Sequence, residues 1–418
     1  MPAGTATLET AADPSSSNPQ ALRRLWLRWA LTALIYAGTL AGGYWLLRDA
    51  WQPGRAAGWL VWAGLAALVE LAILRGSLRH NHPPDSPSLR AGFGYGTALT
   101  LLCGLLLALV AGFLFAPRPP GWLAWMPALL YTAARLVDYI DGYVARITQY
   151  ETKLGGILDM EFDGLGILVA IVLALAIQYG TLPLWYLPLA LARQIFIAGL
   201  WWRERRGLPV YAMTPSAARR IIAGFQTGFV SVMLWPVFAP PLTTLAAVVF
   251  ALPLALSFAR DWGVVSGMID PASPRYLRRR AALKALVEGW LPLCCRVAGT
   301  ALALLLLAAE LPHFPTWRPH LAQSGIADPR GLLWLWSALF LLALLPYLLG
   351  ILGRVAALAL VGLACLDISA AGLDWGGNAW LLIAAIVVAH AGSGRWAVWR
   401  PEDPILHKRP GDSHEVPL

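Results

Sequence analysis

Charged side chains are scarce in this chain. They make up only 13% of its 418 residues, whereas hydrophobic residues make up 58% and the mean hydropathy is +0.61. A soluble domain typically has about a quarter of its residues charged. The composition therefore excludes an ordinary soluble globular protein and predicts an integral membrane protein with several spans.

Cysteine is also rare. The four residues, Cys103, Cys294, Cys295 and Cys365, all lie in apolar runs. None has the C-x-x-C or Cys/His spacing that is typical of a zinc site or a redox pair. We therefore expect buried free thiols, and neither a disulfide scaffold nor a zinc-binding module.

Apolar segments of about the twenty residues that cross a bilayer recur along the chain. They predict an all-α membrane protein with about twelve spans. The segments lie near 25–48, 56–74, 93–116, 121–146, 155–179, 183–202, 217–237, 241–259, 285–310, 331–352, 354–373 and 378–392.

Basic residues fall mostly in alternate loops, which sets an expected orientation. By the positive-inside rule, this asymmetry places both chain ends on the cytoplasmic side of a bacterial-type inner membrane. The net charge of +9 then faces an anionic leaflet, so no nucleic-acid partner is needed to explain it. The basic loops lie near 75–90, 146–153, 203–206, 275–284, 354 and 395–409.

Four aspartates stand in or against two of these apolar segments. Asp138 and Asp141 are three residues apart, and Asp159 and Asp163 are four apart, so each pair projects from one helix face. The connecting segment 147–154 is short and polar, which predicts two antiparallel neighbouring helices. The four carboxylates should therefore converge near the cytoplasmic boundary.

Such a cluster requires cations. One central charge in a membrane span costs roughly 2.5 to 3.5 kcal/mol, and clustered carboxylates repel one another. Hard divalent ions with oxygen ligands compensate them, and two such ions form a clamp suited to phosphoryl chemistry. Ion pairs within the membrane, or the cation pathway of a transporter, are the alternative interpretation.

The surrounding residues match a known pattern. The sequence resembles the CDP-alcohol phosphotransferase family, whose pattern D-x-x-D-G-x-x-A-R-x8-G-x3-D-x3-D it meets at all eight positions. The resemblance implies a six-helix core, over about 93–262, that binds a CDP-linked donor and two Mg²⁺ or Mn²⁺ ions. The positions that match are Asp138, Asp141, Gly142, Ala145, Arg146, Gly155, Asp159 and Asp163.

The resemblance also implies roles for these residues. The metal ligands would be the four aspartates, and Asp163 would also be the general base. The residues lining the cytidine diphosphate would be Asp138, Gly142, Ala145, Arg146 and Gly155.

The implied reaction belongs to phospholipid biosynthesis. An acceptor hydroxyl would attack the β-phosphorus of a CDP-activated donor, most simply CDP-diacylglycerol, and release CMP. Two alternatives stay open: a CDP-aminoalcohol transferase that acts on diacylglycerol, and a transporter or scaffold that keeps the fold without turnover.

The acceptor is less well specified. Arg193 lies in ALARQIFIAGL, which resembles the R-E-I-F-x-S-G-L segment of the phosphatidylglycerophosphate synthases, and Arg219 and Arg220 begin the next span. These arginines would suit an anionic acceptor, although the latter two would equally anchor a helix end at the headgroups. Gly164 replaces the usual lysine of those synthases, which argues against glycerol 3-phosphate.

The rest of the chain flanks the expected core. We expect a disordered cytoplasmic tail over 1–22, two extra spans over 23–92, a basic linker over 263–284, a four-helix membrane region over 285–400 and a second tail over 401–418. A homodimer among membrane lipids is one possible assembly. Polar residues in or near spans are expected to make contacts between helices, namely Arg135, Glu288, Arg296, Asp367 and His390.

Overall fold

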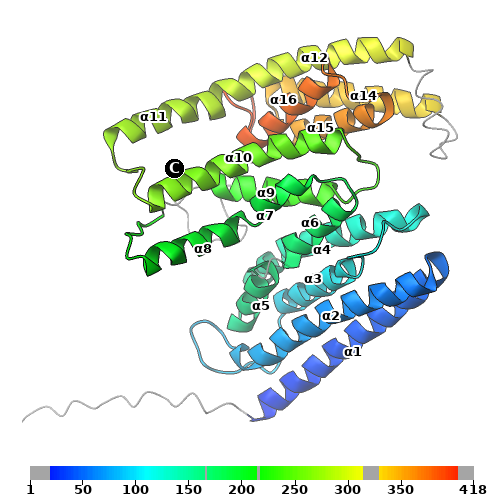
Figure 1. The fold of residues 1–418 in the computed structure, drawn as a ribbon, viewed down its shortest axis with the longest axis vertical. Helices are drawn as coiled ribbons and strands as arrows, with labels where there is room; N and C mark the ends of the chain where they lie inside the picture. Colours follow the sequence, from blue (N-terminus) through cyan, green and yellow to red (C-terminus); the bar gives the residue numbers. More distant parts are fainter. Residues whose placement is uncertain (1–18, 165–166, 214–216, 314–328, 403–418) are drawn as a thin grey trace, which may run out of the picture. The chain divides into compact units, whose positions relative to one another are not determined.

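The computed structural model describes residues 19–164, 167–213, 217–313 and 329–402. This part of the chain is helical, and its only β pairing is an isolated bridge between Ile351 and Trp399 (Figure 1). The expectation of an all-α protein is confirmed for it. The predicted tails fall almost wholly outside the described residues.

The chain divides into two units, Met1–Val172 and Leu173–Leu418. In the first unit, α1 is followed closely by α2, which packs against α3; α3 in turn packs against α4 and α5. The helix α6 (Ile167–Gln178) crosses the boundary between the units. The helices of the first unit are α1 (Pro19–Ala50), α2 (Pro53–Ser77), α3 (Tyr95–Ala111), α4 (Met126–Ile147) and α5 (Lys153–Gly164).

The helix α3 is the centre of the first unit, because other helices approach it closely. Gly104 allows one such approach: a Cβ atom there would lie 2.8 Å from both the Phe162 ring of α5 and Glu70 Oε2 of α2. Two side chains of the N-terminal pair also donate to carbonyls of α3. Tyr36 Oη lies 2.6 Å from the oxygen of Leu101, and Trp59 Nε1 lies 3.1 Å from that of Leu109.

In the second unit, α10 packs against α7, α8 and α9, and α16 packs against α12 and α15. The short 3-10 turn η3 (Leu184–Tyr186) precedes α7. The helices are α7 (Leu187–Ala190), α8 (Ala192–Arg205), α9 (Ala217–Val232), α10 (Leu242–Val265), α11 (Pro274–Lys284), α12 (Leu291–His313), α14 (Pro329–Leu349), α15 (Gly353–Ala371) and α16 (Asn378–Ala391).

The second half of the expected basic linker is helical. The Ser273 hydroxyl caps α11 by accepting from the backbone N–H of Tyr276 at 3.3 Å, and Pro274 occupies the first turn. A π-helical segment, Ala285–Trp290, then joins α11 to α12. The basic residues therefore lie on a helix that continues into an apolar one.

Four helical stretches of the described chain have the length and composition to cross a membrane, which supports a helical membrane protein. Shorter apolar helices, such as Tyr95–Ala111 and Asn378–Ala391, accompany them. The count of twelve spans and the six-helix core remain predictions. The four stretches are Pro19–Ala50, Pro53–His80, Leu242–Val265 and Pro274–Ala308.

All four cysteines are free thiols, as expected, but they are not all buried. Cys103 and Cys365 are buried, whereas Cys294 is exposed on α12. Consecutive helix residues point about 100° apart. Arg296, two positions on, faces the packed side of α12 and is 2% exposed, and Cys294 therefore faces outward.

Candidate metal and nucleotide site

Three of the four predicted aspartates converge in the first unit. The helix α4 supplies Asp138 and Asp141, and α5 supplies Asp159. One carboxylate oxygen of each lies within 4.8 Å of the other two. Asp141 is buried, Asp138 is half-buried and Asp159 is exposed.

A tight reversal between α4 and α5 produces this arrangement. Gln149 adopts a left-handed φ of 50°, and the backbone N–H of Tyr150 reaches back to the oxygen of Ala145 at 3.1 Å. Thr152 then caps α5, since its hydroxyl accepts from the N–H of Gly155 at 3.1 Å. Only a few residues separate the two helices, so their acidic faces meet.

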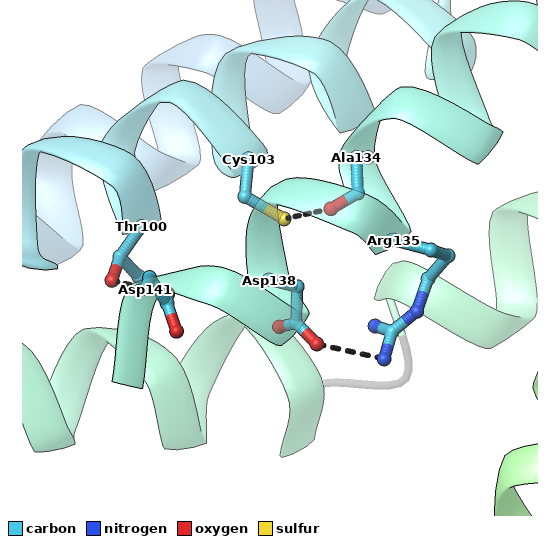
Figure 2. Close-up of polar contacts among 6 residues, drawn as sticks. All are labelled: Thr100, Cys103, Ala134, Arg135, Asp138 and Asp141. Carbon is cyan, nitrogen blue, oxygen red and sulfur yellow. Dashed lines mark hydrogen bonds and ion pairs between the residues drawn. The ribbon is translucent and has the colours of Figure 1, made fainter. Parts of the chain in front are cut away.

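The helix α3 holds Asp141 from the other side. The Thr100 hydroxyl donates to Asp141 Oδ2 at 2.7 Å (Figure 2). Gly96 makes the close approach of the helices possible, because a Cβ atom there would lie 2.7 Å from the Cβ of Ala145 and 3.0 Å from the oxygen of Asp141. Asp141 is thereby oriented by a neighbouring helix as well as by its own.

Asp138 is paired with an arginine. Arg135 Nη2 lies 2.7 Å from Asp138 Oδ2, one turn away on the same helix (Figure 2). The ion pair within α4 places a guanidinium beside one of the converging carboxylates. The expected contact of Arg135 with another helix stays a prediction.

The small residues of the pattern lie around the acids. Arg146 folds back over Gly142, since a Cβ atom at Gly142 would lie 3.3 Å from Arg146 Nη1. Gly155 faces Thr97, whose hydroxyl oxygen would lie 3.2 Å from a Cβ atom there. Ala145 packs against α3, so its small side chain serves helix packing.

The other predicted site residues can be assigned to helices, but not all of their side chains are described. Asp163 belongs to α5, and Arg219 and Arg220 belong to α9, but their side chains lie outside the described part of the structure. Arg193 is exposed in the first turn of α8, in the second unit. The acceptor-binding role of these arginines stays a prediction.

The three described carboxylates suit a divalent cation. Mg²⁺ binds oxygen at about 2.1 Å, so two ligands on opposite sides of one ion are about 4.2 Å apart. The 4.8 Å limit on the carboxylate oxygens is close to that separation, and a small side-chain rotation would close the difference. The all-oxygen donor set favours Mg²⁺ or Mn²⁺ over zinc.

Comparison with protein families identifies this part of the chain. Residues 95–263 match the model of the CDP-alcohol phosphatidyltransferase family. Over this segment the chain is similar to the CDP-alcohol phosphatidyltransferases. The matched segment includes α3, α4 and α5, which carry the converging carboxylates and Thr100.

Curated relatives match parts of the same protein. A CDP-diacylglycerol–glycerol-3-phosphate 3-phosphatidyltransferase of Cereibacter sphaeroides is 35% identical over 106 residues, which are 25% of this chain and 46% of the relative. A protein of Mycobacterium bovis, provisionally named a cardiolipin synthase, is 30% identical over 143 residues, 33% of this chain and 65% of the relative. The chain thus spans about half to two thirds of these relatives. No solved structure matches it significantly.

Sequence reasoning did not identify three residues that organise the candidate site. Thr100 donates to Asp141, and Gly96 permits the approach of α4. Arg135 was noted only as a polar residue in or near a span, and it pairs with Asp138. The spacing of the aspartates gives no signal for Gly96 or Thr100, because both act where α3 packs against α4.

Proposed function

We propose that this protein is a divalent-metal-dependent phosphotransferase of the membrane. It transfers a phosphatidyl group from a CDP-linked donor, CDP-diacylglycerol, to an alcohol acceptor and releases CMP. The observation that carries this proposal is the convergence of Asp138, Asp141 and Asp159 within a segment that is similar to the CDP-alcohol phosphatidyltransferases.

The four aspartates have two roles in this reaction. Asp138, Asp141, Asp159 and Asp163 would hold the metal ions. Mg²⁺ or Mn²⁺ held there would supply positive charge toward the diphosphate and the leaving phosphate. Asp163 accepts the proton of the acceptor hydroxyl. As the oxygen of the acceptor bonds to the β-phosphorus, the bond from that phosphorus to the bridging oxygen breaks, and CMP leaves.

The nucleotide is bound by the small and basic residues of the pattern. Gly142 and Gly155 leave backbone open to the cytidine diphosphate, and Arg146, which lies over Gly142, binds a phosphate. Arg193, Arg219 and Arg220 bind an anionic acceptor. The donor is assigned as CDP-diacylglycerol because the name of the Cereibacter relative includes that lipid.

The proposal includes an orientation. The reversal between α4 and α5 carries Arg146 and Lys153, and the alternating basic loops place it on the cytoplasmic face of the inner membrane. The catalytic core then covers about 93–262, with two membrane helices before it and four after it. Nucleotide enters from the cytoplasm, and the acyl chains of the donor enter from the lipid.

The decisive experiment measures CMP release from CDP-diacylglycerol by the purified protein with Mg²⁺ and a panel of alcohol acceptors. Excess chelator should abolish release, and added Mg²⁺ or Mn²⁺ should restore it. Asp163→Asn and Asp159→Asn should each lower the rate by about a hundredfold or more. Glu161→Gln is the matched control, since Glu161 lies between them on α5 and outside the pattern.

Two results would contradict the proposal. Turnover in Asp163→Asn at the wild-type rate would show that Asp163 is not the general base. CMP release that persists in chelator would show that the reaction does not require a metal ion.

A further inference from the structure

Arg135 is a charged neighbour of the acid cluster that the eight-position pattern does not include. It lies one turn before Asp138 on α4, about 4.5 Å further from the reversal between α4 and α5. The side chains of Arg135 and Asp138 are 24% and 17% exposed, and their charged atoms are 2.7 Å apart. A guanidinium thus already neutralises one of the three carboxylates that would hold a metal.

This ion pair and a bound cation would compete for the same carboxylate. Arginine stays protonated at any accessible pH, so it cannot relieve the conflict by losing its proton. A divalent ion at Asp138 would therefore weaken the attraction between Asp138 and Arg135. A guanidinium in an apolar helix of a membrane protein favours an anionic neighbour.

The proposed substrate supplies that anion. The planar guanidinium binds phosphate oxygens through paired N–H donors. Arg146 lies 11 residues after Arg135, about 16 Å further along the axis of α4, so the two arginines flank the acids on opposite sides. Arg146 is nearest the nucleotide side in the proposed orientation, and Arg135 is nearest the acyl chains.

We propose that Arg135 exchanges partners: it holds Asp138 before the metal binds, and it binds the lipid-bearing phosphate of the donor once Asp138 is a metal ligand. The inference rests on the proposed function and adds a substrate-binding residue to it. It makes Arg135 both a competitor of the metal and a contact of the donor.

The first test measures Mn²⁺ binding to the purified full chain without substrate, by electron paramagnetic resonance. Arg135→Gln should tighten Mn²⁺ binding about fivefold, because it removes the competing charge. Arg135→Lys keeps the charge and should bind Mn²⁺ like the wild type. Arg48→Gln is the matched control, since Arg48 lies on α1 over the ring of Trp45.

The second test measures kcat/KM for CDP-diacylglycerol at saturating Mn²⁺. Arg135→Gln should lower it about tenfold to a hundredfold, and Arg135→Lys should lower it less. An arginine with a purely structural role would weaken Mn²⁺ binding and turnover together, whereas the exchange of partners moves them in opposite directions.

Either of two results would overturn the inference: Mn²⁺ binding in Arg135→Gln that is unchanged or weaker, or an unchanged kcat/KM for the donor. A wild-type protein that releases no CMP would instead refute the proposed function and, with it, the donor contact. The Mn²⁺ measurement would still decide the competition at Asp138. A monodisperse size-exclusion profile checks that each variant is folded.

Discussion

Buried polar side chains have different roles in the two units. In the first unit they join α3 to its neighbours: Thr100 of α3 donates to Asp141 of α4, and Tyr36 and Trp59 donate to carbonyls of α3. In the second unit they join segments of the C-terminal helices to one another. There, Arg296 donates to the carbonyls of Tyr347, Leu348, Ser393 and Arg395.

The difference shows how a site and a scaffold use polar groups within apolar surroundings. In the first unit, the hydroxyl of Thr100 fixes the direction of a carboxylate, which a binding site requires. In the second unit, Arg296 and Arg354 place a charge among backbone carbonyls, and Arg354 Nη1 lies 2.6 Å from the oxygen of Ala389. Variants at Arg296 and Arg354 should therefore affect stability, and variants at Thr100 should affect chemistry.

The largest expected effect is on stability, in Arg296→Met. This side chain is 2% exposed, and its removal takes a donor away from several backbone carbonyls, among them the buried one of Ser393. We expect a loss of roughly 3 kcal/mol in the free energy of unfolding, measured by thermal unfolding in detergent. Arg278→Met, on the exposed face of α11, is the matched control.

The contrast between the two units would be contradicted if Arg296→Met changed metal binding by the acid cluster. Mn²⁺ binding by the folded fraction of this variant should equal that of the wild type. A folded Arg296→Met protein with weakened Mn²⁺ binding would show that the buried arginine of the second unit also serves the site.

A smaller effect, on activity, is expected at Gly96. An alanine Cβ there would lie 2.7 Å from the Cβ of Ala145, so α3 and α4 must separate. Overpacking of this kind costs about 1 to 3 kcal/mol, and the shift would move Asp141 relative to Thr100. We expect CMP release to fall by about tenfold or more.

Gly64→Ala on α2 is the control for this variant, because a Cβ at Gly64 has no atom within 4 Å. It should leave the rate unchanged. Equal rates in Gly96→Ala and the wild type would show that the close approach of α3 and α4 is not needed for the site.

The sequence predicted the acid cluster well because its cause is local. The spacing of Asp138 and Asp141, the spacing within α5 and the short reversal together bring Asp159 to Asp141. The contact of Thr100 with Asp141 joins residues 41 positions apart, and it depends on how closely two helices pack. Spacing along one chain carries no information on that distance.

Helix boundaries were harder to predict than helix content. The expected segment 183–202 is divided among η3, α7 and α8. Pro183 precedes η3 and Pro188 lies in the first turn of α7, since proline is favoured where a helix starts. Hydropathy measures apolar length, which does not show where a helix stops.

The smallest expected effect tests the attachment of the N-terminal helices. Tyr36→Phe removes the hydroxyl that donates to the oxygen of Leu101 at 2.6 Å. Leu101 lies inside α3, so its carbonyl also accepts the N–H four residues on and is not left without a donor. We expect a loss of about 0.5 to 1 kcal/mol in thermal unfolding, with CMP release almost unchanged. Tyr44→Phe, elsewhere on α1, provides the reference. If the fall in the rate of CMP release, expressed as a free energy, exceeded the fall in stability, the Tyr36 hydroxyl would position α3. The N-terminal pair of helices would then belong to the site.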